Sequence, residues 1–132
     1  MRRANVAPIL NGSASVGKKI LIVDDDRTMT NLLKTLLELD DFEVKTVTRG
    51  GDAISQATSF QPEAFIVDFH LHDMEGVELV QQLRTLPAFA NSLIIIASGM
   101  DKEAESIAAG ANRFLLKPYD PDSLSNLLKA SI

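Results

Sequence analysis

Residues 20–26 read ILIVDDD, four branched apolar residues followed directly by three aspartates. A short apolar run of this kind is typical of a strand that is buried on both faces, as the strands of a parallel sheet are. Residues 64–68 read AFIVD and repeat the arrangement, an apolar run that ends in an aspartate. The two stretches predict buried parallel strands whose carboxyl ends carry acidic side chains.

Three more apolar runs alternate with helical patterns along the chain. The further strands are predicted at Phe42–Val47, Leu93–Ala97 and Arg113–Leu116, and helices at residues 51–60, 76–86, 102–109 and 121–130. The first helix is the clearest, because apolar residues three or four positions apart form a stripe that can cover a sheet face: Met29, Leu32, Leu33, Leu36 and Leu37. Five strand–helix alternations predict a doubly wound α/β fold, (βα)5, with a five-stranded parallel sheet and helices on both faces.

The length and composition of the chain fit one compact domain of 132 residues. Residues 1–17 show neither strand nor helix periodicity and are expected to form a flexible tail, which leaves residues 18–132 as the domain. The net charge of −5 argues against nucleic-acid binding, and the lack of cysteine excludes disulfides and thiolate nucleophiles. No apolar run is long enough to span a bilayer and no usable signal peptide is present, so we expect a cytoplasmic location without membrane contact.

Acidic side chains follow two of the predicted strands, at the edge where sheets of this class bind ligands. Asp24 and Asp25 come directly after the first strand and Asp68 after the third, so pairing of these strands would gather three carboxylates. Such carboxylates repel one another unless a cation is present, and hard oxygen ligands suit Mg²⁺. Asp26 directly precedes the first helix, and we interpret it as a helix cap instead.

A hydroxyl group and an ammonium group follow the fourth and fifth strands. Ser98 is followed by Gly99, where the backbone can approach a ligand closely. Lys117 is followed by Pro118, which permits a cis peptide bond that would aim the lysine inward. The ordered set of residues offers a nucleophilic carboxylate, ligands for Mg²⁺ and two groups to hold phosphoryl oxygens, which predicts phosphoryl transfer to a carboxylate.

Five motifs carry a resemblance to a known family: Asp24-Asp25 after Ile-Leu-Ile-Val, Asp68 after Phe-Ile-Val, Gly76 eight residues later, Ser98 after Ile-Ile-Ile-Ala, and Lys117-Pro118. Together they resemble the receiver domain of two-component response regulators. The resemblance covers residues 18–132 and implies a flavodoxin-like fold with strand order 2-1-3-4-5.

The resemblance also implies a role for each residue of the site. Asp68 would accept a phosphoryl group from a histidine kinase or a histidine phosphotransfer protein, so the domain would signal and would not act as an enzyme on other substrates. Ser98 and Lys117 would contact the bound phosphoryl group. Mg²⁺ would be held by Asp24, Asp25, Asp68 and the main-chain carbonyl of His70.

A switch and an output surface are implied as well. Ser98 and an aromatic residue of the fifth strand, here Phe114, would move together on phosphorylation. The signal would pass to a downstream protein through the fourth helix, the fifth strand and the fifth helix. Phe114 lacks the hydroxyl group of the tyrosine that is commoner in the family, so this switch must work by packing alone.

The loop after Asp68 departs from the family pattern, because His72 stands where proline is usual. We therefore expect residues 69–75 to be less rigid than in the family. Neither His70 nor His72 is expected to bind a transition metal through its imidazole, since nothing in a loop fixes both rings on one centre.

Two other interpretations remain open. A haloacid-dehalogenase-like phosphatase carries Asp-x-Asp-x-Thr after a strand, which Asp24, Asp26 and Thr28 match. That class needs a further acidic pair after a later strand, where this chain has Ser98 and Lys117. An adaptor that is never phosphorylated is disfavoured, because every site position is chemically competent. A stand-alone receiver and a piece of a longer protein fit the sequence equally well.

Overall fold

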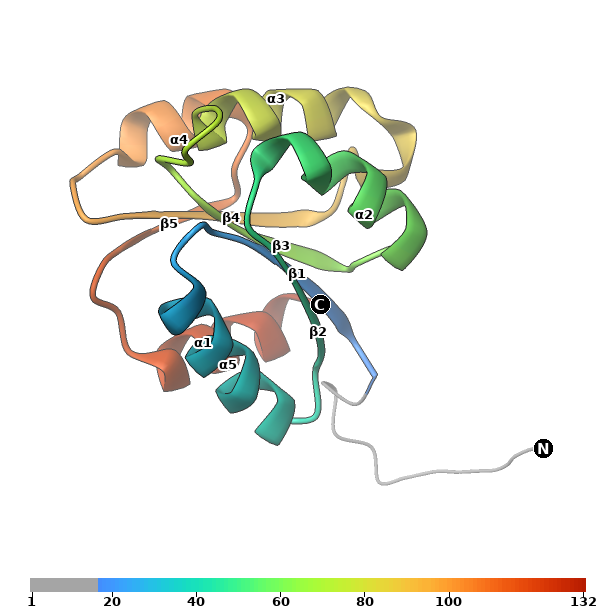
Figure 1. The fold of residues 1–132 in the computed structure, drawn as a ribbon, viewed down its shortest axis with the longest axis vertical. Helices are drawn as coiled ribbons and strands as arrows, with labels where there is room; N and C mark the ends of the chain where they lie inside the picture. Colours follow the sequence, from blue (N-terminus) through green and yellow to red (C-terminus); the bar gives the residue numbers. More distant parts are fainter. Residues whose placement is uncertain (1–16) are drawn as a thin grey trace.

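The computed structural model describes residues 17–132, so the predicted tail lies outside the described residues except for Gly17. Five strands form one parallel sheet in the order β2-β1-β3-β4-β5 (Figure 1). They are β1 (Lys19–Val23), β2 (Glu43–Val47), β3 (Ala64–Asp68), β4 (Leu93–Ser98) and β5 (Arg113–Leu116). The predicted fold class and strand order are confirmed, and each strand boundary differs from its prediction by at most one residue.

The register of the strands brings the predicted site residues to one edge. Val23 of β1 pairs with Val67 of β3, so Asp24 and Asp68 follow side by side. Ser98 of β4 pairs with Leu116 of β5, which puts Lys117 next in line at the same edge. Parallel pairing therefore delivers residues that are up to 93 positions apart in sequence to the carboxyl edge of the sheet.

Helices cover both faces of the sheet. Helices α1 (Arg27–Leu39) and α5 (Pro121–Ser131) cover one face, and α2 (Ala53–Phe60), α3 (Gly76–Thr85) and α4 (Glu103–Ala109) cover the other (Figure 1). Two short 3₁₀ helices, Gly50–Asp52 and Pro87–Phe89, precede α2 and β4. Each face of the sheet has its own apolar core, one centred on Leu37 and Leu128 and the other on Leu79 and Leu83. Within residues 17–132, no helix is long and apolar enough to cross a membrane.

The apolar stripe of α1 is wider than the sheet face that it covers. Leu33 and Leu37 are buried against the sheet, as the stripe predicts. Met29 and Leu32 keep 54% and 52% of their surface exposed, so this half of the stripe does not reach the core. These exposed residues and Leu36 line a cavity beside the carboxyl edge, which is described below.

At the amino edge of the sheet, Arg84 near the end of α3 hydrogen-bonds to the segments that precede β4 and β5. Its guanidinium group donates from all three nitrogens: Nε to the carbonyl of Gly110, Nη1 to the carbonyls of Phe89, Ala90 and Ser92, and Nη2 to Oδ1 of Asn112. The same Asn112 oxygen accepts the backbone N–H of Ile94 in β4. One side chain thus joins α3 to the segments that lead into β4 and β5.

Candidate functional site

Three carboxylates meet at the carboxyl edge of the sheet. One oxygen from each of Asp24, Asp25 and Asp68 lies within 4.8 Å of the other two. Asp24 and Asp25 follow β1 directly, and Asp68 is the last residue of β3. The sheet therefore brings together the carboxylates that the sequence analysis selected.

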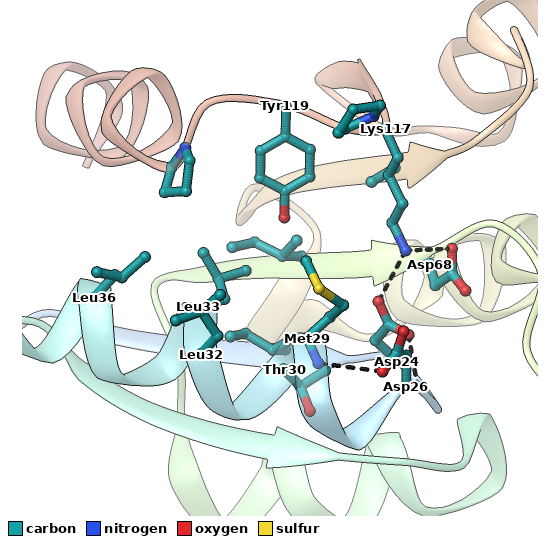
Figure 2. Close-up of a pocket in the computed structure, with 15 residues that line it drawn as sticks. Asp24, Asp26, Met29, Thr30, Leu32, Leu33, Leu36, Asp68, Lys117 and Tyr119 are labelled. Carbon is teal, nitrogen blue, oxygen red and sulfur yellow. Dashed lines mark hydrogen bonds and ion pairs between the residues drawn. The ribbon is translucent and has the colours of Figure 1, made fainter.

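Lys117 points into this group of carboxylates (Figure 2). Its Nζ atom lies 3.0 Å from Oδ2 of Asp24 and 3.2 Å from Oδ1 of Asp68. The peptide bond between Lys117 and Pro118 is cis, the isomer that the sequence permits. The ammonium group bridges two of the three carboxylates.

The charges of the site shift the pKa values of Asp68 and Lys117. Burial raises the pKa of Asp68, the negative charge of Asp24 raises it further, and Lys117 offsets part of the increase. Burial alone would lower the pKa of Lys117, but its hydrogen bonds and charge pairing with Asp24 and Asp68 outweigh burial and raise the pKa. The site therefore holds a cationic lysine beside a carboxylate whose ionised form is disfavoured.

The acidic group has the features of a site for a divalent cation. Oδ2 of Asp25 is buried and finds no hydrogen-bond donor among residues 17–132. A buried carboxylate oxygen without a donor is costly unless a cation meets it. Asp24, Asp25 and Asp68 supply hard oxygen ligands, the kind that Mg²⁺ prefers, so the residues present fit that ion.

Asp26 is not part of this cluster of carboxylates and caps α1. Its side chain accepts the backbone N–H of Met29 at 3.1 Å, as an N-cap residue does. Oδ1 of Asp24 accepts the N–H of Asp26 at 3.0 Å, which fixes the turn between β1 and α1. The predicted cap is thus observed, and the second aspartate of the dehalogenase-like motif is engaged by the helix.

Ser98 and Phe114 occupy the predicted strand positions. Ser98 is the last residue of β4, 1% exposed, and its Oγ accepts the N–H of Met100 at 3.1 Å. Phe114 of β5 is half-buried and packs against the core on the α2, α3 and α4 face. The hydroxyl group is therefore engaged by the loop after β4.

Gly76 holds the loop between β3 and α3 against the site. Its N–H donates to the carbonyl of Phe69 at 2.6 Å. A Cβ atom at this position would stand 2.3 Å from the carbonyl oxygen of Asp68, so only glycine fits. The glycine of the sequence motif is thus explained by the close approach of two backbones.

Asp73 ties the same loop to the turn before α2. Its carboxylate accepts the N–H groups of Gly50 at 2.9 Å and of Gly51 at 2.8 Å. These hydrogen bonds, first that from Gly51 and then that from Gly50, lower the pKa of Asp73. The expected loss of rigidity at His72 stays a prediction, but the loop has an anchor that the sequence analysis did not identify.

A mainly apolar cavity of about 280 Å³ adjoins the carboxylates. Met29, Leu32 and Leu36 line it from α1, and Tyr119 lines it from the loop before α5 (Figure 2). Burial raises the pKa of Tyr119. Sequence reasoning did not select Tyr119, although its position directly after Lys117-Pro118 was the available signal.

Comparisons with known proteins agree with this geometry. Residues 20–129 match the family described as response regulator receiver domain. Over 117 residues the chain is 32% identical to the phosphate regulon transcriptional regulatory protein PhoB of Rhizobium meliloti, covering 86% of this chain and 52% of that protein. It is 30% identical to the chemotaxis protein CheY of Thermotoga maritima, covering 86% of this chain and 96% of CheY.

Solved structures give the same result. The structure of the chemotaxis response regulator CheY4 of Vibrio cholerae superposes with a TM-score of 0.82 at 26% identity, covering 89% of this chain and 100% of that one. The chain spans about half the length of the transcriptional regulators that it matches.

Proposed function

The chain belongs to the receiver-domain family of two-component response regulators, and from this premise we propose that Asp68 is its phosphoacceptor. The observation that carries the proposal is the position of Asp68, whose Oδ1 lies 3.2 Å from the ammonium group of Lys117 and whose carboxylate is clustered with those of Asp24 and Asp25. Receiver domains of response regulators signal through phosphorylation. A carboxylate in this setting combines a nucleophile with groups that stabilise an incoming phosphoryl group.

In the proposed reaction an oxygen of Asp68 attacks the phosphorus of a phosphohistidine. The phosphorus–oxygen bond forms as the phosphorus–nitrogen bond breaks, and the imidazole of the donor leaves with the electron pair. Lys117 already contacts Asp68 and would follow the new negative charge onto the phosphoryl oxygens. Ser98 would have to release the N–H of Met100 before its hydroxyl group could donate to the same oxygens.

Mg²⁺ would neutralise the carboxylates and the phosphoryl oxygens when it is bound. Asp24, Asp25 and Asp68 would hold it, together with the main-chain carbonyl of His70. The buried Oδ2 of Asp25 supports this assignment, since it accepts no hydrogen bond within the described part of the chain.

We propose that the phosphoryl group comes from a histidine kinase or a histidine phosphotransfer protein. The transfer would take place in the cytoplasm, where ATP provides the phosphoryl group for such kinases. The output would pass through α4, β5 and α5 to a downstream protein. Exposed Ile107 on α4 and Leu116 on β5, which keep 45% and 54% of their surface accessible, support a contact surface there. Phe114 of β5 is partly buried and packs against the core, so repacking of its ring would couple this surface to the core.

The dehalogenase-like alternative is not favoured by the family match or by the site. Its second aspartate, Asp26, caps α1 and is not among the three clustered carboxylates. The two chemistries still differ in a testable way, because they form the acyl phosphate on different strands: on Asp68 at the end of β3 or on Asp24 after β1.

The test uses the full chain with Mg²⁺ and acetyl phosphate as the donor, and intact-protein mass spectrometry as the readout. The parent should gain one phosphoryl group that hydroxylamine removes. Asp68→Asn should abolish labelling, whereas Asp24→Asn should only slow it, because it removes one electrostatic contribution. Persistent labelling of Asp68→Asn together with loss in Asp24→Asn would establish the enzyme alternative, and a parent that is never labelled would establish the adaptor.

A further inference from the structure

The loop between β3 and α3, residues 69–75, begins directly after Asp68 and is closed by its own backbone. At its base the N–H of Gly76 donates to the carbonyl of Phe69 at 2.6 Å. Within the loop the N–H of Leu71 donates to the carbonyl of Met74 at 3.1 Å. These two hydrogen bonds shape the loop, but its position relative to the other loops of the carboxyl edge depends on contacts with another segment.

Asp73 makes two hydrogen bonds of that kind. Its Oδ1 atom accepts the N–H of Gly50 at 2.9 Å, and its Oδ2 atom accepts the N–H of Gly51 at 2.8 Å. The two glycines precede Asp73 by 23 and 22 positions and lie in the 3₁₀ helix before α2. Hydrogen bonds to an ionised carboxylate are roughly twice as strong as those between neutral groups. One N–H on each oxygen fixes both the position and the orientation of this carboxylate.

Apolar side chains of the loop contact the same 3₁₀ helix. A Cβ atom at position 50 would clash with the sulfur of Met74 and would stand 3.1 Å from Cδ1 of Leu71. Leu71 is buried and belongs to the core on the α2, α3 and α4 face of the sheet. The loop therefore packs on Gly50 through its side chains and is hydrogen-bonded to the same glycine through Asp73.

The position of this loop matters for the proposed reaction. Asp68 precedes it directly, and it contains the main-chain carbonyl of His70 that the proposed function assigns to Mg²⁺. Proline is the usual family residue at position 72 and would restrict the backbone of the loop, whereas this chain has His72. In place of that restriction, this chain has a carboxylate that ties the loop to a neighbouring segment.

We propose that Asp73 is a positioning residue for phosphoryl transfer to Asp68. By holding residues 69–75 on the 3₁₀ helix before α2, it keeps the carbonyl of His70 in place beside the carboxylates. Asp73 acts through the loop and takes no part in the bonds that form and break. This inference rests on the proposed function, because it concerns the reaction assigned to Asp68.

The variants that test the proposal remove the two hydrogen bonds in steps. Asp73→Asn keeps one oxygen that can accept an N–H, and Asp73→Ala keeps none. Asp52→Asn is the matched control, because Asp52 lies exposed in the same 3₁₀ helix and makes no side-chain cap hydrogen bond. A double variant, Asp73→Ala with His72→Pro, replaces the lost tie by the restriction that proline gives to the backbone.

The first measurement is the rate of phosphorylation of the full chain by acetyl phosphate at a series of Mg²⁺ concentrations. The Mg²⁺ concentration that gives half of the maximal rate should rise about tenfold in Asp73→Asn and further in Asp73→Ala, since groups that orient a metal ligand have effects of this size. The rate at saturating Mg²⁺ should fall less. Asp52→Asn should stay within about twofold of the parent, and the double variant should recover at least part of the loss.

The second measurement is amide hydrogen exchange of the metal-free protein, which reports the loop without reference to phosphorylation. Exchange should become faster at the N–H of Leu71 in both Asp73 variants and should stay unchanged in β1 and β3. Faster exchange throughout these strands would indicate a general loss of stability, and it would overturn the inference.

Three further results would also overturn it: a Mg²⁺ dependence of Asp73→Ala within about twofold of the parent, an equal change in Asp52→Asn, or no recovery in the double variant. In each of these cases the proposed function stands as long as the parent is labelled and Asp68→Asn is not. A parent that is never labelled, or a labelled Asp68→Asn, would instead refute the proposed function itself.

Discussion

The two edges of the sheet neutralise their polar groups to different degrees. At the carboxyl edge one ammonium group, that of Lys117, faces three clustered carboxylates, and an oxygen of Asp25 lacks a donor among residues 17–132. At the amino edge every nitrogen of the Arg84 guanidinium group donates a hydrogen bond, and its acceptors are mostly uncharged main-chain carbonyls. The first edge is left with excess negative charge, and the second is close to satisfied.

This contrast indicates that the amino edge stabilises the fold, whereas the carboxyl edge is the functional site. A satisfied network stabilises the fold, and breaking it leaves polar groups without partners. Clustered carboxylates destabilise the fold until a cation or a phosphoryl group changes the balance, which is a common property of functional sites. Removing a carboxylate charge at the carboxyl edge and removing the guanidinium donor at the amino edge should therefore change the free energy of unfolding in opposite directions.

The largest effect is expected at the amino edge. Arg84→Ala removes the guanidinium donor from the carbonyls of Gly110, Phe89 and Ser92, so the free energy of unfolding should fall by about 3 kcal/mol. Urea denaturation would measure this change. The phosphorylation rate should stay at the parental value, because the opposite edge keeps its contacts.

Arg113→Ala is the control for Arg84→Ala. Its exposed guanidinium group donates to the neighbouring carbonyl of Asn112, so the loss should stay within about 0.5 kcal/mol. Equal effects of the two substitutions would contradict the special role of the Arg84 network.

A smaller loss is expected where the carboxyl edge is packed most tightly. Gly76→Ala would push a methyl group against the carbonyl of Asp68, so the free energy of unfolding should fall by about 2 kcal/mol and phosphorylation should slow. Gly99→Ala, where a Cβ atom meets nothing within 4 Å, should be tolerated in the same urea assay. If both variants were as stable as the parent, the close approach at Gly76 would be wrong.

Substitution of Asp68 is expected to raise the free energy of unfolding, whereas the substitutions above lower it. Because burial and Asp24 raise its pKa in the folded protein, Asp68 favours folding only below its unfolded pKa, and this contribution is lost as the pH rises through the folded pKa. At pH 7 the ionised group is therefore unfavourable, and Asp68→Asn should stabilise the metal-free protein by about 1 kcal/mol. Urea denaturation with a chelator would measure this gain. Added Mg²⁺ should stabilise the parent more than the variant, so the difference between their free energies of unfolding should shrink. A variant that is less stable than the parent without metal would refute the proposed charge imbalance.

Much of the carboxyl edge was predictable because it follows from strand ends. Each apolar run fixes where a parallel strand stops, and the residues that follow must meet at one edge. This reasoning, together with the family resemblance, identifies Asp24, Asp25, Asp68 and Lys117 from the sequence. It could not give the orientation of Ser98, whose hydroxyl group depends on the conformation of the loop that follows β4.

The amino edge was not predictable for a physical reason. Arg84 meets segments that are 5 to 28 positions away, and no periodicity marks such a set of acceptors. The prediction that the whole apolar stripe of α1 is buried was wrong in part for a related reason. Periodicity gives the side of the helix on which apolar residues lie, but not the width of the face that covers them. Met29 and Leu32 are therefore exposed although the pattern predicts burial.

The smallest effect concerns Asp73, which anchors the loop after β3 through the N–H groups of Gly51 and Gly50. Its pKa is lowered in the folded protein, so its contribution to stability is present above the unfolded pKa and is lost as the pH falls through the folded pKa. Asp73→Asn should lower the urea midpoint slightly at pH 7, and the difference from the parent should vanish as the pH falls through the lowered pKa of Asp73. Asp52→Asn is the control, because Asp52 lies in the turn before α2 that Asp73 contacts and makes no side-chain cap hydrogen bond. The difference in urea midpoint between the parent and Asp73→Asn could instead stay constant down to acidic pH. In that case the carboxylate is not the anchor, and other contacts hold the loop that carries His70 and His72.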